Sequence, residues 1–485
     1  MNSIKNNASF IIKVFILIIL IIDISYSFKQ YYGEPIDGDV PNIVNPAPIY
    51  QKVLSDPLGI SILKGGEKYA ATNRFSCHYM MRFWFNDVYS FFSLFSKNKI
   101  KCLYFTAAIF SLFVQYFLIA FLSVFITKKI KFWRLSFLIP CILLLPFFQS
   151  NGFESQIGII DQCITYTFFY ALPISLFIFY LIPFYLIETS TNYIQKWKKN
   201  MIAILSIPFS LFLSFSSPLI APLVLLLLPS IIIYLFIEKY KIADKIDFGD
   251  KVKHAISIFP YYLLFSYVPY ILFCVYSFYI GTFNIENGSS MPLFERYNLL
   301  FEGIPKYFVA KLGLPFILLI LVVNFIINKK RNKNYKISLA TIFLFLLCIV
   351  YIFLLPFGGY RNYRPMIIRY DTFIPITIVL LFFVAKGTFL LLGQLKGIYF
   401  KSYLIFIAII LLVFWIADTP QFNKNECQMS NLYNIKNSKE DLFVLNSNCT
   451  ILSCINISDP SWGSNISDML FKWKITDKRK DFVNR

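Results

Sequence analysis

Repeated long apolar runs constrain the fold of this chain more than any other feature. Several of them reach 18 residues or more, which is enough to cross the roughly 30 Å of hydrocarbon in a bilayer. Hydrophobic residues make up 57% of the 485 residues and charged residues only 15%, whereas a soluble domain is nearer half apolar and carries more charge. The sequence therefore predicts an all-α polytopic membrane protein whose core lies mostly inside the bilayer.

The apolar runs predict about eleven transmembrane helices. The first is interpreted as an uncleaved anchor, because its apolar stretch is long and no small-residue cleavage site follows; a signal peptide is the alternative. A break at Ser216, Ser217 and Pro218 separates two later spans. The expected spans are residues 8–28, 102–127, 133–149, 162–188, 201–217, 219–237, 257–283, 310–328, 337–357, 372–393 and 403–418.

The basic residues support this arrangement. The net charge is +20. With an inner amino terminus, five lysine-rich clusters between spans all fall on the inner side, at 128–134, 196–199, 239–253, 329–336 and 396–401. Merging residues 201–237 into one span would break that pattern. The charge thus reflects membrane topology, and no nucleic-acid partner is expected. Residues 1–418 are predicted to form one multi-span domain with a long first external loop at 29–101, and residues 419–485 a small external tail.

Three acids stand just beyond the first span, in the motif GEPIDGD. Glu34, Asp37 and Asp39 occupy six consecutive positions, and like charges so close raise one another's pKa or share a cation or a substrate hydroxyl. A solvated acidic turn is the alternative. Because external loops contain few acids and this group lies beside the membrane, we expect these residues to be catalytic.

The rest of the first loop is expected to lie on the membrane surface. An apolar face over residues 49–63 and the aromatic stretch FWFNDVYSFFSLF (residues 83–95) are typical of short interfacial helices, although an aromatic belt explains the second equally well. His78 is one of two histidines. It is a candidate for contacting a phosphate or acting as an acid, and a structural role is the alternative.

Two further external loops contain candidate binding residues. Glu154 and Asp161 flank the second loop, where Asp161 either faces an aqueous cavity or caps the next helix.

The late loop GGYRNYRPMIIRYD (residues 358–371) carries three external arginines, against the charge bias. Arginine's planar fork suits bidentate phosphate binding, so Arg361, Arg364 and Arg369 are predicted to bind a phosphate or pyrophosphate. Anchoring to anionic headgroups is the alternative.

The nine cysteines suggest no metal site, because none shows paired zinc-ligand spacing with histidine. Four fall in segments expected outside, where disulfides form: Cys77, Cys427, Cys449 and Cys454. Pairing of Cys427 with either Cys449 or Cys454 would staple the tail. The absence of a Walker loop, G-x-S-x-G and H-E-x-x-H argues against a nucleotide-driven pump and a triad hydrolase.

Taken together, these features resemble those of the GT-C-type integral membrane glycosyltransferases, which include the protein mannosyltransferases and the aminoarabinose transferases. EPIDGD matches the acidic motif of that superfamily in placement. RNYRPMIIRYDTFIP resembles its late loop, in which arginine and an RY-x-x-x-x-P-like stretch precede a span. The resemblance covers most of residues 1–418 as architecture. The acidic motif departs from the commoner Asp-Glu pair, which leaves both Asp37 and Asp39 as candidates.

The resemblance implies sugar transfer from a polyprenyl-phosphate donor to a lipid, glycan or protein acceptor on the outer face of a membrane, most simply a bacterial plasma membrane. Asp37 or Asp39 would deprotonate the acceptor hydroxyl, and the late-loop arginines, with Tyr370, would stabilise the leaving phosphate. Direct displacement would invert the anomeric centre. A divalent cation, Mg²⁺ or Mn²⁺, held by the two aspartates is required in some members and not in others.

Three other classes of protein stay open. A polyprenyl-linked sugar flippase or other transporter explains the many spans and the external arginines, but it should carry ionisable residues deep in its spans, where only Asp23 and Lys386 are seen. A polysaccharide polymerase or ligase also keeps external arginines in late loops, usually without a long first loop. A structural membrane protein is the third.

Overall fold

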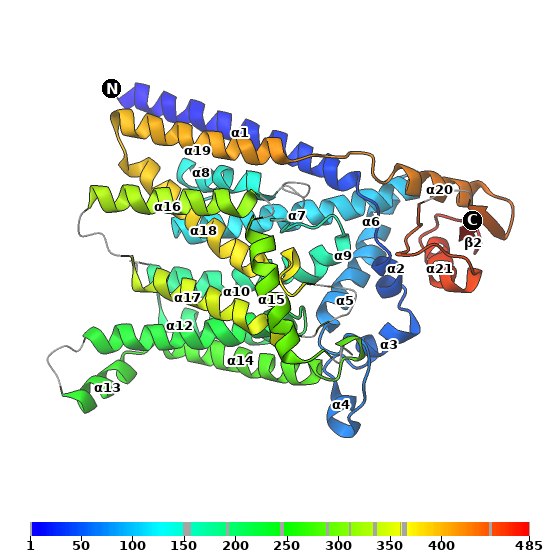
Figure 1. Cartoon of the computed structure of the whole chain (residues 1–485), viewed down its shortest axis with the longest axis horizontal. Helices are drawn as coiled ribbons and strands as arrows, with labels where there is room; N and C mark the ends of the chain where they lie inside the picture. Colours follow the sequence, from blue (N-terminus) through cyan, green and yellow to red (C-terminus); the bar gives the residue numbers. More distant parts are fainter. Residues whose placement is uncertain are drawn as a thin grey trace.

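The structure is a computed structural model that describes residues 2–148, 157–190, 194–242, 247–287, 291–309, 312–332, 337–358, 360, 366–445 and 449–484. It is dominated by helices, as expected (Figure 1). The α-helices are α1 (Asn2–Tyr32), α2 (Asp39–Val44), α3 (Pro48–Ser55), α4 (Ile60–Gly65), α5 (Phe75–Phe83), α6 (Tyr89–Leu94), α7 (Lys99–Thr127), α8 (Leu135–Leu144), α9 (Ile164–Tyr166), α10 (Leu172–Thr189), α11 (Lys196–Ser214), α12 (Ile220–Ile242), α13 (Phe248–Ser257), α14 (Tyr261–Gly281), α15 (Leu293–Val309), α16 (Gly313–Arg331), α17 (Leu339–Leu354), α18 (Tyr370–Gln394), α19 (Gly397–Ala417), α20 (Glu426–Asn437) and α21 (Ser464–Lys472).

Shorter elements complete the chain. Two π-helical turns, η1 (Trp84–Val88) and η4 (Thr167–Ala171), interrupt helical stretches, and 3-10 turns are η2 (Leu145–Phe148), η5 (Ile285–Asn287), η6 (Leu355–Phe357) and η7 (Pro460–Gly463). Strands β1 (Leu442–Leu445) and β2 (Asp481–Asn484) pair in parallel in the tail.

Nine helices in the described part of the chain are long and apolar enough to cross a membrane, which fits a multi-pass integral membrane protein. Many of their large apolar side chains are exposed on the outside of the bundle, as expected where lipid rather than water surrounds a protein. The nine are Phe10–Tyr32, Lys99–Thr127, Ile164–Thr189, Ile220–Lys241, Tyr261–Gly281, Gly313–Arg331, Leu339–Phe357, Tyr370–Gln394 and Gly397–Ala417.

The other two expected spans correspond to helices that differ from the nine. Leu135–Phe148, formed by α8 and η2, is a shorter apolar helical stretch, and its 14 residues reach only about 21 Å. Helix α11 has 19 residues but begins with Lys196, Lys198 and Lys199. The count of eleven therefore stays a prediction. The break expected near Ser216 is confirmed, because α11 ends at Ser214 and α12 begins at Ile220.

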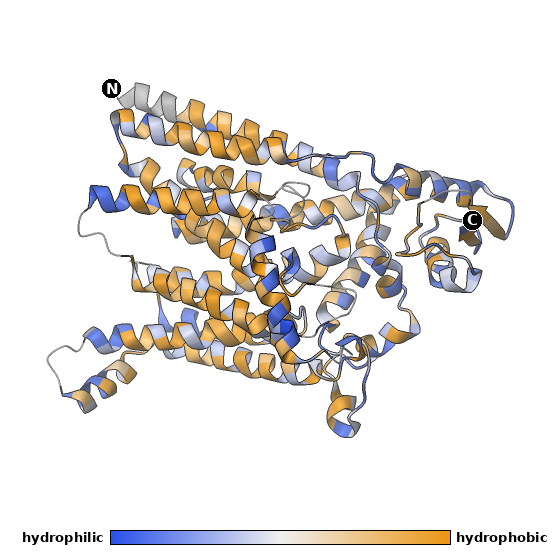
Figure 2. Cartoon of the chain, in the orientation of Figure 1, coloured by the Kyte–Doolittle hydropathy of each residue, from blue (hydrophilic) through white to orange (hydrophobic). Residues whose placement is uncertain are grey.

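The long helices lie roughly along one direction, and their two ends differ (Figure 1). The carboxyl ends of α12, α16 and α18 lie at one end of the bundle, on the left of Figure 1, where α16 ends with Lys329, Lys330 and Arg331. Helices α2 to α6, α20 and α21 lie toward the opposite end. Hydrophobic residues fill the middle of the bundle and hydrophilic ones gather toward both ends (Figure 2).

The segment between α1 and α7 folds as five short helices and the π-helical turn η1. Its aromatic residues divide between two environments. Phe85 and Tyr89 are buried, whereas Phe83, Phe91 and Phe95 are exposed. Exposed aromatic rings beside the membrane spans agree with the surface position expected from the sequence.

The tail packs on the first loop. Gly33 O accepts a hydrogen bond from the Asn425 backbone N at 2.9 Å, and a Cβ on Gly33 would come within 2.2 Å of Phe422 O. Cys427 and Cys449 form a disulfide that closes a loop within the tail. This is one of the two pairings expected, and Cys454 is a free cysteine.

Candidate functional site

Asp37 connects the first loop to the start of α9. Thr165 donates to its carboxylate twice, from the backbone N at 3.0 Å and from Oγ1 at 2.7 Å. A third hydrogen bond comes from the Asp39 backbone N at 3.1 Å, which closes the turn that leads into α2. Asp37 itself is half-buried. The three hydrogen bonds fix the direction of the Asp37 carboxylate.

Asp161 lies in the same region, in the segment before α9. Its carboxylate accepts from the Cys163 backbone N at 2.7 Å and from the Tyr370 hydroxyl. Burial, together with the negative charges of Asp371 and Asp37, raises the pKa of Asp161 to about 6, although the two hydrogen bonds oppose that shift. The hydrogen bond from Cys163 agrees with the capping role of Asp161, and the aqueous cavity expected at this position stays a prediction.

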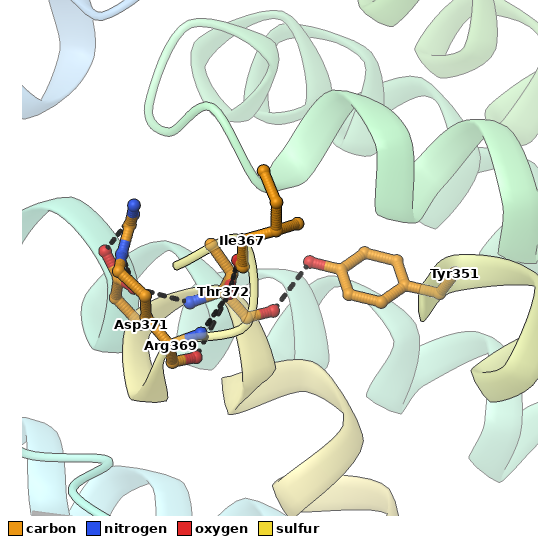
Figure 3. A network of polar contacts seen from close by, with 5 residues as sticks. All are labelled: Tyr351, Ile367, Arg369, Asp371 and Thr372. Carbon is orange, nitrogen blue, oxygen red and sulfur yellow. Dashed lines mark hydrogen bonds and ion pairs between the residues drawn. The ribbon is translucent and has the colours of Figure 1, made fainter. Parts of the chain in front are cut away.

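Arg369 and Asp371 form a bidentate ion pair at the start of α18 (Figure 3). Arg369 Nε lies 2.9 Å from Asp371 Oδ1, and Nη2 lies 2.8 Å from Oδ2. The Asp371 side chain is only 2% exposed, so the guanidinium neutralises a buried carboxylate. The Arg369 guanidinium, which we expected to bind a phosphate, therefore binds a carboxylate at the start of the same helix in this structure.

The first turn of α18 holds that ion pair in place. The Thr372 backbone N donates to Asp371 Oδ1 at 2.8 Å, and the Arg369 backbone N donates to Thr372 Oγ1 at 3.1 Å. The Tyr351 hydroxyl donates to Thr372 O at 3.0 Å and so ties α17 to the same turn (Figure 3). Such a local network limits the positions that the Arg369 side chain can adopt.

Asp37, Asp161 and Asp371, which we call the aspartate cluster, come from three segments far apart in the sequence. The charges of Asp37 and Asp371 both act on Asp161. Tyr370, which donates a hydrogen bond to Asp161, directly precedes Asp371 in the chain. The π-helical turn η4 follows Thr165 directly, and π-helical turns are frequent at functional sites. Carboxylates held close together in a partly buried site are typical of general acid–base chemistry.

Asp39 is oriented toward a different set of residues. Its charge acts on the Tyr50 hydroxyl and, with that of Asp37, on the Cys454 thiol; burial first and then these charges raise the pKa of Cys454. Tyr50 in turn donates to Glu286 Oε1 at 2.9 Å. The charges of both aspartates of the motif thus act on Cys454, and that of Asp39 also acts on Tyr50.

Glu34, the third acid of the motif, faces the tail. It is 6% exposed, and its Oε1 lies 3.1 Å from Lys424 Nζ. This ion pair fastens the tail to the end of α1. The geometry assigns Glu34 a structural contact, and its expected catalytic role stays a prediction.

His78 is buried in α5, between the rings of Tyr50 at 5.4 Å and Phe169 at 5.3 Å. Burial, and then the Arg74 charge, lower its pKa to about 3, so the imidazole is neutral at pH 7. These surroundings do not suit a phosphate-binding cation or a general acid. They agree with the structural alternative.

Three of the expected site residues lie outside the described part of the chain. These are Arg361 and Arg364 of the late loop and Glu154 of the second loop.

The divalent cation considered between Asp37 and Asp39 stays a prediction. Thr165 and the Asp39 backbone donate to the two oxygens of Asp37. Within the described ranges, no group of three or more His, Cys, Asp or Glu residues is placed to hold a metal ion.

Sequence reasoning missed two members of this site. Asp371 stands directly after the Arg-Tyr pair that it identified, and Thr165 stands four residues after Asp161. An acid and a hydroxyl residue within the first turn after a predicted loop are common helix-capping choices, which is why neither drew attention alone.

Comparison with known proteins identifies no relative: no family model, no curated protein and no solved structure matches this chain.

Proposed function

We propose that this protein is a membrane glycosyltransferase that moves a sugar from a polyprenyl-phosphate donor to a lipid, glycan or protein acceptor at the bundle end that carries the first loop. The observation that carries the proposal is the aspartate cluster. Three carboxylates from three distant segments are coupled there, next to a tyrosine and an arginine. Burying carboxylates costs free energy, so a membrane protein with a purely structural role has no need to bring them together.

Asp37 is the base in this proposal. An acceptor hydroxyl attacks the anomeric carbon, and a bond forms between that oxygen and the carbon as the bond to the phosphate oxygen breaks. The hydroxyl proton moves to the Asp37 carboxylate, and the lipid phosphate leaves with the electron pair. One displacement inverts the anomeric centre. Asp37 is preferred over Asp39 because its charge acts on Asp161 within the cluster.

The other members of the cluster orient the base and the leaving group. Asp161 has a pKa near 6, so it gains or loses its proton near neutral pH. Its hydrogen bond with Tyr370 connects it to the start of α18. Arg369 stays charged and lies at the edge of the cluster, where developing phosphate charge would be stabilised. Arg361 and Arg364 belong to the same late loop and are proposed to share that role.

The proposed setting follows the same reasoning. Helix α16 ends with Lys329, Lys330 and Arg331 at the bundle end opposite helices α2 to α6, and positive charge marks the inner side of a membrane. The cluster and the tail would then face outward, on a bacterial plasma membrane.

The test is a transfer assay on the full chain in lipid nanodiscs, with radiolabelled polyprenyl-phosphate sugars and a crude membrane fraction as acceptor. Wild type is compared with Asp37→Asn and, as the matched control, Asp39→Asn. We expect Asp37→Asn to lose about 10²-fold or more of the transfer rate and Asp39→Asn to retain it within about threefold. Equal transfer by wild type and Asp37→Asn would exclude Asp37 as the base. Absence of transfer from every donor, with translocation of the sugar lipid across liposomes instead, would establish a flippase.

A further inference from the structure

Two cavities flank Lys472 of the tail, and neither contains a residue of the aspartate cluster. The first, of about 450 Å³, is lined by residues of α5, η1 and α6 together with Lys472 and Trp473 of the tail. The second, of about 640 Å³, is lined by tail residues that include Lys472. Lys472 therefore forms a wall shared by both cavities.

Buried polar atoms without partners mark these cavities as more than surface irregularities. Trp473 lines the first cavity and is 3% exposed, yet its indole Nε1 has no hydrogen-bond partner among the described residues. The same holds for Asn86 Oδ1 in the first cavity and for Thr476 Oγ1 in the second, where Thr476 is 4% exposed. Buried polar groups are rarely left unsatisfied unless something else binds them.

The local backbone is unusual on both sides of Lys472. Asn86 stands in the π-helical turn η1, a distortion found often at functional sites. Lys474, which lines the second cavity, has a φ of 55°. A left-handed conformation costs a residue other than glycine roughly 1–2 kcal/mol, and such strain gathers at binding sites.

The linings combine positive charge with exposed aromatic rings. Arg82 and Asp87 line the first cavity, and Lys436, Lys474 and Asp477 line the second. Asp477 is paired with Lys480 at 3.0 Å, so the cations predominate.

Three rings in these linings are about half exposed: Tyr79 at 51%, Phe83 at 47% and Phe471 at 50%. Such rings offer flat faces to the C–H surface of a sugar ring, while the cations and amides meet its carboxylates and hydroxyls.

An aromatic path joins this region to the candidate site. The ring of Trp473 lies 6.2 Å from that of Phe85, and Phe85 lies 6.1 Å from Phe168. Phe168 belongs to the π-helical turn η4, which directly follows α9. Thr165 of α9 donates a hydrogen bond to Asp37. The first cavity is therefore connected to the segment that carries Thr165 through packed aromatic rings.

We propose that the two cavities flanking Lys472 bind an acidic oligosaccharide, one that carries carboxylates on a hydroxyl-rich chain. The saccharide lies across the end of α21, with its carboxylates against Lys472 and its neighbouring cations and its ring faces against the exposed aromatic side chains. This proposal deepens the proposed function. It rests on that function only because it names this glycan as the acceptor of the transferred sugar.

The experiment measures binding by isothermal titration calorimetry to the full chain in nanodiscs. Three probes of similar length are compared: a tetrasaccharide of galacturonic acid, uncharged maltotetraose and a tetraglutamate peptide. Lys472→Ala removes the shared wall, and Lys439→Ala is the matched control, because Lys439 is an exposed tail lysine outside both linings. Tyr79→Ala tests the aromatic contribution separately.

The expected result is tightest binding of the galacturonic acid tetrasaccharide, weakened about fivefold by Lys472→Ala and about threefold by Tyr79→Ala, with Lys439→Ala unchanged. Equal weakening by Lys439→Ala, or equal binding of tetraglutamate, would reduce the site to a nonspecific polyanion surface and overturn the proposal, as would no binding of the tetrasaccharide. Saccharide binding without any sugar transfer would leave this site standing while the proposed function fails. Sugar transfer that depends on Asp37, with no binding of the tetrasaccharide, would support the proposed function and overturn the saccharide site.

Discussion

Asp37 and Thr165 are joined by two hydrogen bonds across 128 positions of sequence, one from the Thr165 backbone N and one from its Oγ1. This pair fixes the turn after the first span against the start of the third long apolar helix, Ile164–Thr189. It also sets the direction of the Asp37 carboxylate relative to Asp161. Thr165 is therefore a positioning residue in the proposed reaction.

Replacing Thr165 by valine should separate positioning from folding. Valine keeps the shape and the backbone hydrogen bond but removes the one from Oγ1. We expect kcat for sugar transfer to fall about tenfold while KM changes less than about twofold, because the orientation of the base changes and the donor contacts do not. Thr165→Ser, which restores the hydroxyl, should recover most of the rate. A serine variant as slow as the valine variant would contradict this role.

Removing the Arg369 side chain should destabilise the protein strongly. Arg369→Ala removes the bidentate ion pair with the 2% exposed Asp371 carboxylate, and breaking a buried pair costs about 3 kcal/mol of unfolding free energy. Denaturant unfolding in detergent, followed by intrinsic fluorescence, measures the loss.

The double variant Arg369→Ala/Asp371→Ala should be less destabilised than the sum of the two single variants, since no lone buried charge remains. The matched control is Lys306→Ala, whose pair with Glu302 is 3.9 Å long and mostly exposed; it should lose under about 1 kcal/mol. A similar loss for the control would contradict the special role of the Arg369 pair.

The pH dependence of stability should report Asp161. Its pKa is raised to about 6 in the folded protein, above the usual value of about 4 in an unfolded chain. The neutral carboxyl is thus favoured by folding, so its contribution is fully present below about pH 4 and is lost as the pH rises to about 6. Relative to wild type, Asp161→Asn should gain stability progressively over that window and remain level above it. Parallel melting curves for the two proteins from pH 4 to 7 would show that Asp161 does not titrate there.

The tail disulfide should be detectable by peptide mapping without reduction. We expect one crosslinked peptide containing Cys427 and Cys449, and alkylation of Cys454 before reduction because it is free and exposed. Cys449→Ser should destabilise the tail by about 2–4 kcal/mol, which hydrogen exchange over α20 and α21 would register. A crosslink to Cys454 would instead favour the other pairing.

Gly33 should be intolerant of any side chain. A Cβ at this position would come within 2.2 Å of Phe422 O, so Gly33→Ala must displace the tail from the end of α1. Limited proteolysis should release the tail faster in this variant. Gly65→Ala is the matched control, because nothing lies within 4 Å of its Cβ. Equal proteolysis of both variants would show that the tail does not dock there.

The sequence by itself determined that the chain is helical and built for a membrane, where most of its spans begin and end, and where α11 gives way to α12. Hydrophobicity is a local property that adds along consecutive residues, so a run of apolar side chains specifies a span without reference to the rest of the fold. The lysine clusters carry topology in the same local way. The expected spans 133–149 and 201–217 are the two that do not appear among the nine long apolar helices of the described residues. The first forms a short helix, and the helix that contains the second, α11, begins with lysines.

Only the tertiary structure decided which acids meet. Glu34, Asp37 and Asp39 look equivalent in the sequence, yet Glu34 pairs with Lys424, Asp37 accepts hydrogen bonds from Thr165, and the charge of Asp39 acts on Tyr50. Each orientation depends on a segment packed from elsewhere in the chain: the tail, the start of α9 and the helix α3. A polar side chain acquires its pKa and its role from such neighbours, and the pattern of residues along a chain does not contain their distances.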